Sequence, residues 1–193
     1  MEAPSLDLGL GEEKTRPPIG DGLGDNFGDG LTGGGAADET FRKAMRKAGA
    51  LLSGRPRTVH EMRERLLTAG VGPSVVTRVV DRLRELGLLD DSEFARAWIE
   101  ERSRRKGLAG TALVNELIAK GVEPETAERA VADAGLDEDA MAKALAARLH
   151  LRIKGLPVRA QVSRLQGALA RRGFGTEVIE AGVRSILPPE GWD

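Results

Sequence analysis

Clusters of arginine and lysine carry the clearest chemical signal in this chain. Between Phe41 and His60 there are six basic residues and no acidic one. Like charges four residues apart on a helix repel each other, so a solvated helix face usually mixes both signs. A run of one sign therefore favours a surface that binds a polyanion or an acidic protein. The six residues are Arg42, Lys43, Arg46, Lys47, Arg55 and Arg57.

Two further basic groups join this candidate binding set. One ends a predicted helix and comprises Arg102, Arg104, Arg105 and Lys106; the other is the pair Arg171 and Arg172. The helix dipole alone favours positive charge in a last turn, by about 0.3–1 kcal/mol per residue. The group at 102–106 is therefore a weaker binding signal than the six basic residues between Phe41 and His60. Aromatic residues make up 3% of the chain, which argues for contacts with a phosphate backbone and against base stacking. We expect such contacts to be salt-sensitive and weakly sequence-specific.

Carboxylates and histidines offer little for catalysis. The adjacent Asp90 and Asp91 could hold a magnesium ion or form an acid–base pair. Aspartates at a helix start are more simply explained as N-terminal caps, and Glu93 stands where a capping box needs it. His60 and His150 lie far apart in the sequence, without the spacing of metal ligands. We therefore predict no catalytic residue, no metal site and no cofactor.

An aromatic pair follows these aspartates. Phe94 and Trp98 stand four residues apart and could form a ligand platform. Together with Ala97 they fall on one apolar helix face, which favours a place in the hydrophobic core.

The first 38 residues differ from the rest of the chain. They are rich in glycine and aspartate and show no sustained hydrophobic period, so we expect a disordered acidic tail over residues 1–38. The aspartates miss the ligand spacing of an EF-hand loop. The glycines are not followed by the Gly-Lys-Ser/Thr of a phosphate-binding loop. We predict neither a calcium site nor a nucleotide site there.

The remaining chain repeats itself with a period near 50 residues. In each unit a helix ends at a glycine, and a turn and another amphipathic helix follow; these glycines are Gly70, Gly121 and Gly173. The surrounding apolar positions align as Leu66, Val71, Val76, Val80 and Leu83, as Leu117, Val122, Ala127, Val131 and Ala134, and as Leu169, Phe174, Ile179, Val183 and Ile186. Units of this size stack on their neighbours. We predict an all-α fold of three tandem three-helix repeats in a curved, elongated array, over residues 39–90, 91–136 and 137–187, with a C-terminal tail at 188–193.

Charge alternates along the chain, although the formal net charge is only −1. Residues 1–40 hold 9 acidic and 2 basic residues, and residues 41–106 hold 9 acidic and 16 basic ones. Residues 107–140 hold 8 acidic and 2 basic residues, whereas residues 141–187 hold 2 acidic and 9 basic ones. Two basic lobes therefore flank an acidic one in the part expected to fold.

The composition favours a cytoplasmic protein. The chain has no cysteine, which fits a reducing compartment. Its start lacks a basic segment followed by an apolar run, so we expect no secretory signal. It also lacks a run of about 18 apolar residues, so we expect no membrane-spanning segment.

Three motifs resemble those of the RecX family of recombination regulators. They are Gly-Leu-Leu-Asp-Asp-x-x-Phe-Ala-x-x-Trp at 87–98, Arg-Pro-Arg-Thr-x-x-Glu-Met-Arg-Glu-Arg-Leu at 55–66 and Leu-x-x-Arg-Gly-Phe at 169–174. The resemblance covers about residues 39–187. It implies a curved array of three three-helix repeats that binds the RecA recombinase, chiefly as its filament on DNA, and inhibits its ATPase, strand-exchange and co-protease activities. The long acidic tail is not a feature that the family requires.

Two other functions remain open at this point. Three-helix units resemble helix-turn-helix domains, so the chain could bind DNA on its own, with weak sequence specificity. A small helical enzyme that uses Asp90 or Asp91 is the third possibility. Of the three, the filament regulator agrees with both the residues and the resemblance, and it needs no membrane and no small-molecule substrate.

Overall fold

The computed structural model describes residues 35–189 and Trp192. Nearly all of the predicted acidic tail, residues 1–34, lies outside the described residues. The first helix already begins at Ala36, inside the segment predicted as tail.

Within the described part, the chain forms nine helices and no strand, which confirms the predicted all-α fold. Three consecutive helices make each repeat. Their bounds are α1 (Ala36–Gly54), α2 (Val59–Thr68) and α3 (Pro73–Glu85), then α4 (Asp91–Lys106), α5 (Gly110–Ala119) and α6 (Pro124–Asp133), and finally α7 (Glu138–Ile153), α8 (Val158–Ala170) and α9 (Thr176–Arg184).

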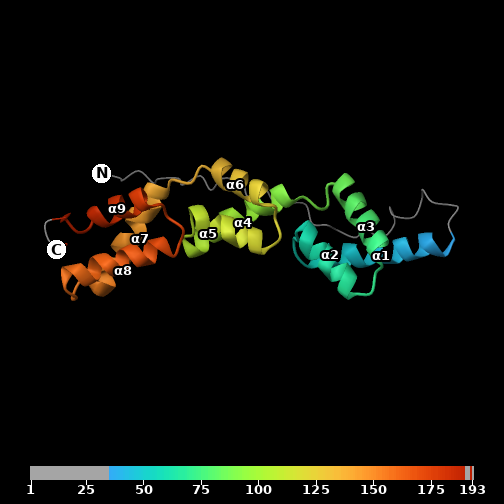
Figure 1. The fold of residues 1–193 in the computed structure, drawn as a ribbon, viewed down its shortest axis with the longest axis horizontal. Coiled ribbons are helices and arrows are strands. Elements are labelled where there is room, and N and C mark those ends of the chain that lie inside the picture. Colours follow the sequence, from blue (N-terminus) through green and yellow to red (C-terminus); the bar gives the residue numbers. More distant parts are fainter. Residues whose placement is uncertain (1–34, 190–191, 193) are drawn as a thin grey trace, which may run out of the picture.

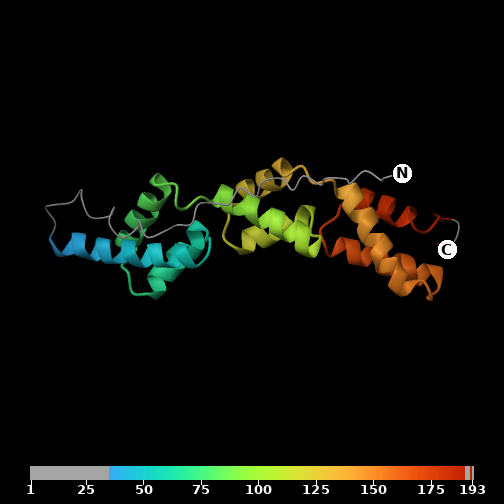
Figure 2. The same ribbon diagram turned by 180° about the vertical axis from the view of Figure 1, so that it is seen from behind.

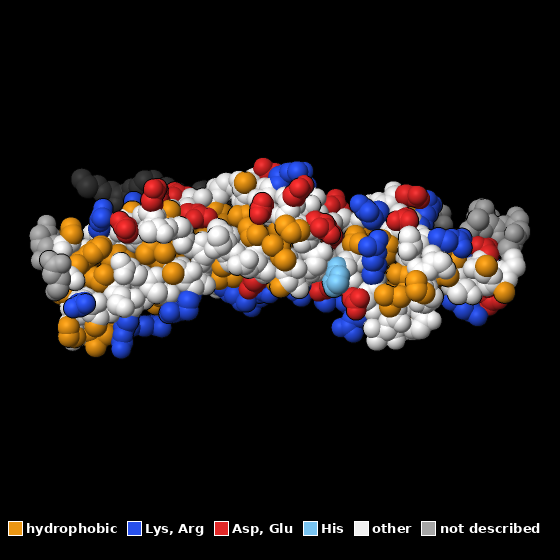
Figure 3. Space-filling view, in the orientation of Figure 1, with side chains coloured by type: hydrophobic (Ala, Val, Ile, Leu, Met, Phe, Trp, Pro, Cys, Tyr) orange, Lys and Arg blue, Asp and Glu red, His pale blue; other side chains and the backbone are white. Residues whose placement is uncertain are grey.

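The three repeats follow one another along the long axis of an elongated molecule (Figures 1 and 2). The third helices of the repeats, α3, α6 and α9, lie along one edge in both views. The opposite edge is hollowed beneath the second repeat (Figure 3). This outline agrees with the curved array expected from the repeat pattern.

Each repeat buries its own hydrophobic core. The three core clusters are built from α1–α3, α4–α6 and α7–α9, with only short extensions from neighbouring segments. Leu66, Leu117 and Leu169, which the repeat pattern places at equivalent positions, are all 0% exposed. The glycine four residues after each of them has a positive φ of 78°, 81° or 89°. A residue without a Cβ adopts this conformation at low cost, so the recurrent glycines end the second helices.

The packing of α4 in the second repeat differs from the sequence prediction at Ala97. Phe94 is buried, as predicted, and its ring stacks on Trp98 with a centroid separation of 5.6 Å. Ala97, however, is exposed, so its assignment to the core is wrong. The buried stripe of α4 runs through Ala95 and Ile99, because the helix is rolled toward that side.

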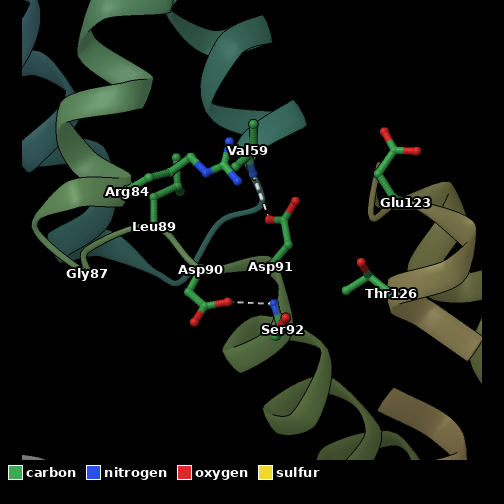
Figure 4. A pocket seen from close by; sticks show the side chains of 9 residues that line it. All are labelled: Val59, Arg84, Gly87, Leu89, Asp90, Asp91, Ser92, Glu123 and Thr126. Carbon is green, nitrogen blue, oxygen red and sulfur yellow. Dashed lines mark hydrogen bonds between the residues drawn. The ribbon is translucent and has the colours of Figure 1, made fainter. Parts of the chain in front are cut away.

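The first and second repeats are joined by polar contacts. The Asp91 carboxylate accepts a hydrogen bond from the Val59 backbone N–H at 2.8 Å (Figure 4). The Thr58 hydroxyl donates to the Lys120 carbonyl oxygen at 2.7 Å, and the Lys120 ammonium donates to Glu61 at 3.0 Å. The close approach also depends on Gly121, because a Cβ there would overlap the side chain of His60.

Burial and these partners shift the pKa values of both carboxyl groups at this joint. Burial raises the pKa of Asp91, and this effect outweighs the hydrogen bond from Val59. Burial would also raise the pKa of Glu61, but hydrogen bonds from Lys120 and Arg55, with their positive charges, lower it overall. The contribution of Asp91 to folding stability therefore falls as the pH rises, whereas that of Glu61 falls as the pH is lowered.

The second and third repeats are joined mainly by hydrogen bonds of backbone groups. The Ala109 N–H donates to the Arg172 carbonyl oxygen at 2.9 Å, and the Gly110 N–H donates to the Glu138 carboxylate at 2.9 Å. Gly173 has φ +89°, and a Cβ there would overlap the backbone of Ala109 and Ala112. Only glycine allows the two repeats to approach this closely.

Replacing Asp91 tests the first joint. Asp91→Ala removes the acceptor of the Val59 N–H and should lower the free energy of unfolding by about 1–2 kcal/mol, whereas Asp91→Asn keeps an acceptor oxygen and should lower it less. Because the folded chain holds the Asp91 proton more tightly than the unfolded chain does, wild-type stability relative to Asp91→Asn should fall as the pH rises above the ordinary pKa of 3.8. Urea unfolding at several pH values measures both effects, and equal losses for Ala and Asn would contradict the hydrogen-bond role.

Replacing Gly173 tests the second joint. Gly135 provides the matched control, since it has φ +58° but open space around it. Gly135→Ala should cost about 1–2 kcal/mol for the left-handed backbone alone. Gly173→Ala should cost clearly more, because the methyl group must also push the Ala109–Ala112 backbone away. Urea unfolding compares the two variants, and similar losses would show that the close approach is not required.

Candidate polyanion-binding surface

The basic residues of α1 divide into paired and unpaired cations. Arg42 lies 3.9 Å from Asp38, and Lys43 lies 2.7 Å from Glu39, each one helical turn away. These acids precede the acid-free run seen in the sequence, so the face is less uniformly basic than predicted. Arg46 and Lys47 are exposed and form no ion pair with any described residue. They are the cations of α1 with the greatest freedom to bind an anion.

Arg55 and Arg57 have structural partners within the first repeat. Arg55 pairs with Glu61 at 2.9 Å, and the Arg57 guanidinium donates to the Leu51 carbonyl oxygen at 3.0 Å. Burial, and after it the neighbouring Arg55, lowers the pKa of Arg57. These contacts give both residues a role in holding the α1–α2 connection.

The basic end of α4 is also partly engaged. Arg102 stacks over the Trp98 ring at 4.0 Å and pairs with Glu116 at 2.8 Å. Lys106 reaches the same carboxylate at 3.4 Å, and Arg105 pairs with Glu101 at 3.0 Å. Arg104 is exposed and has no ion pair within the described residues. Arg102 therefore belongs to the packing of the second repeat, and Arg104 points its charge to solvent.

The fold brings two predicted basic groups together. The Arg172 guanidinium donates to the Lys106 carbonyl oxygen at 3.4 Å, across 66 residues of sequence. It also donates to the Ala168 carbonyl oxygen at 3.0 Å, while Arg171 is exposed and without an ion pair in the described structure. The end of α4 and the α8–α9 turn thus form one basic region, which we call the second-joint cations: Arg104, Arg105, Lys106, Arg171 and Arg172. The cations of α1 lie in the first repeat, toward the other end of the molecule (Figure 1).

The sequence prediction missed a larger basic group in the third repeat. Residues 140–176 contain eight lysines and arginines and no aspartate or glutamate. Six of the eight were not among the predicted site residues, and all six are exposed without an ion pair to any described residue. We call them the third-repeat cations: Lys143, Arg148, Arg152, Lys154, Arg159 and Arg164. The long interval without an acid was visible in the sequence and was the signal that could have identified them.

Charge is unevenly distributed over the surface. In Figure 3, lysines and arginines gather along the hollowed edge, including the part formed by α8, and acidic side chains gather along the edge formed by α3, α6 and α9. Cations that lack nearby carboxylates produce a positive potential that attracts phosphates. The hollowed edge is therefore the candidate binding surface.

The Asp90–Asp91 pair lies in an open pocket at the first joint. This pocket, about 390 Å³ in volume, is also lined by Arg84, Glu123 and Thr126 (Figure 4). Asp90 accepts from the Ser92 and Glu93 N–H groups at 2.7 and 3.2 Å, which confirms it as the cap of α4. Asp91 is instead bonded to Val59, so its predicted role as a cap is replaced by a contact between repeats. Across the described residues, no group of three or more histidines and carboxylates is arranged to hold a metal ion.

None of the described helices combines the length and apolar character needed to cross a bilayer.

Comparison with known proteins supports the repeat assignment. Family models described as the first, second and third three-helix domains of RecX match residues 44–83, 90–131 and 137–181. A crystal structure of RecX from Lactobacillus salivarius superposes with a TM-score of 0.72, at 19% identity, over 77% of this chain and 97% of that one. At this identity the superposition shows the fold alone.

Curated relatives give the closer sequence match. The regulatory protein RecX of Thermobifida fusca is 36% identical over 165 residues, which is 84% of this chain and 89% of the relative. That of Streptomyces coelicolor is 37% identical over 144 residues, 74% of this chain and 77% of the relative. Three matched domains in the expected order, with relatives covered over most of their length, show that this chain belongs to the RecX family.

Proposed function

We propose that this chain binds the RecA recombinase, chiefly as its filament on DNA, and inhibits its ATPase, strand-exchange and co-protease activities. Membership of a family of regulatory proteins supports the proposal. The observation that carries it is the elongated row of repeats with unpaired cations along the hollowed edge (Figures 1 and 3). A filament presents repeated subunits and a phosphate backbone, and this shape and charge fit both.

The proposed mechanism is a difference in binding energy. An array of three rigid repeats lies along the filament and contacts more than one recombinase subunit, while Arg104, Arg171, Lys143 and Arg164 approach DNA phosphates. A ligand shifts a conformational equilibrium by its differential affinity for the two states. Tighter binding to an inactive arrangement of the filament is therefore sufficient for inhibition.

In this proposal the chain acts as a binding protein in the cytoplasm and not as an enzyme. The Asp90 oxygens are used in capping α4, and Asp91 holds the first joint. Variants Asp90→Asn and Asp91→Asn should therefore retain inhibition as long as they fold. Loss of function in a fully folded variant would instead favour the enzyme hypothesis.

Stand-alone DNA binding is the second candidate, and the unpaired third-repeat cations are the observation in its favour. The two functions differ in whether the recombinase increases the affinity of the chain for DNA. A filament regulator binds the assembled filament more tightly than bare DNA, whereas a DNA-binding protein binds both equally and leaves the recombinase unaffected.

The direct test adds the full chain to RecA assembled on single-stranded DNA. ATP hydrolysis should fall, and the chain should sediment with the filament. Cross-linking to the assembled filament then identifies the subunits that it contacts. Unchanged hydrolysis, with the chain left in the supernatant, would refute the proposal.

Removing two third-repeat cations tests the phosphate contacts. Lys143→Ala combined with Arg164→Ala should weaken binding to the filament and lower the slope of log affinity against log salt by about 1 per cation. Arg129→Ala is the control, since Arg129 is exposed on the acidic α6. It should leave both the affinity and the slope unchanged. Titrations from low to high salt measure the slopes, and an unchanged slope in the double variant would place these two side chains away from phosphate.

A further inference from the structure

The last turn of α7, just before the turn that leads to α8, carries the most exposed large apolar side chain of the described residues. Leu151 is 67% exposed, whereas the other exposed large apolar residues range from 38% to 42%. Val158, at 38%, stands at the start of α8 on the other side of the same turn. In Figure 3 apolar side chains with lysines and arginines beside them occupy the lower left corner, where Figure 1 places this turn.

Cations accompany Leu151 along the chain. Arg148 and Lys154 stand three residues before and after it, and residues at this spacing are neighbours on a helix surface. Arg152 and Arg159 complete the group, all four are exposed, and none pairs with an acid among the residues described. We call Leu151, Val158 and these four cations the α7–α8 tip.

The turn that follows Leu151 is held in a defined conformation by a buried side chain. Gln161 is 5% exposed, and its amide donates to the carbonyl oxygens of Leu156 at 2.6 Å and Lys154 at 3.3 Å. The Lys154 N–H donates to the His150 carbonyl oxygen and the Leu156 N–H donates to the Ile153 carbonyl oxygen, at 2.9 Å each. A turn fixed before binding loses less entropy when a partner orders it, which raises the affinity that its contacts provide.

We propose that the α7–α8 tip inserts Leu151 into an apolar socket, rimmed by carboxylates, on a protein partner. An apolar centre surrounded by charged residues is the usual arrangement of a protein–protein contact. Resting on the function proposed above, the socket lies on the recombinase itself. Because the four cations pair with no acid in the part of the chain that the structure describes, we place an acidic rim around the socket on that partner.

Other partners fit the tip less well. Single-stranded nucleic acids are bound by cations combined with aromatic side chains that stack on bases, and the tip has no aromatic residue. Phosphate binding alone uses the cations and leaves Leu151 without a role. A second copy of the chain would bring the same positive charges together at this tip.

The test replaces Leu151 with serine in the full chain. Binding of N-terminally labelled protein to RecA on a single-stranded oligonucleotide should weaken about tenfold or more, because a leucine is no longer buried. Binding to the bare oligonucleotide should not change. Leu67→Ser is the control, since Leu67 is 42% exposed on α2 of the first repeat, four residues after the exposed Arg63. It should leave both affinities unchanged, and circular dichroism melts should show that both variants remain folded.

Four results would overturn the proposal while leaving the proposed function intact. One is equal filament binding by wild type and Leu151→Ser. A second is an equal loss on the bare oligonucleotide, which would assign the tip to nucleic acid. Loss of binding to phosphatidylserine vesicles, with filament binding kept, would assign it to a lipid surface. Loss of a wild-type dimer, seen by light scattering, would assign it to a second copy. If the wild-type chain itself does not bind the filament, both the proposed function and the assignment of the recombinase as the partner of the tip are refuted.

Discussion

The hydrogen bond from the Val59 N–H to the Asp91 carboxylate shows how this molecule is held together between its repeats. Each repeat has its own core, so the relative placement of the repeats depends on a small number of specific contacts. At the first joint these contacts are polar, through Asp91, Thr58 and Lys120. At the second joint they are mainly backbone contacts made possible by Gly110 and Gly173. A binding surface that spans several repeats depends on both joints.

The joints also organise the cations. Glu61 and Glu116 each neutralise basic residues near a joint or within the second repeat, so Arg55, Arg102 and Lys106 contribute to the architecture. The third repeat lacks such acids between residues 140 and 176, and its basic side chains remain available. The same residue type therefore supports the fold in one repeat and a binding surface in another. Position relative to carboxylates decides which role applies.

Local signals predicted most of the fold. The glycine at the end of each second helix and the Asp90 cap of α4 act over a few residues, so they can be read from sequence. Whether Ala97 faces the core or the solvent could not be predicted, because the rotation of α4 about its own axis is set by the helices packed on it. The partner of Asp91 lies 32 residues away. The candidate site was predicted only in part, since ion pairing such as Arg55 with Glu61 depends on how the chain folds.

Because the repeats have separate cores and few hydrogen bonds between them, the stiffness of the array varies along its length. A force along the long axis acts in series on the three repeats and the two joints. The cores resist it with many packed side chains, while each joint resists it with a handful of hydrogen bonds. The molecule is therefore stiff within a repeat and compliant between repeats. A binder with this build can follow a helical track whose pitch changes without losing the packing of any single unit.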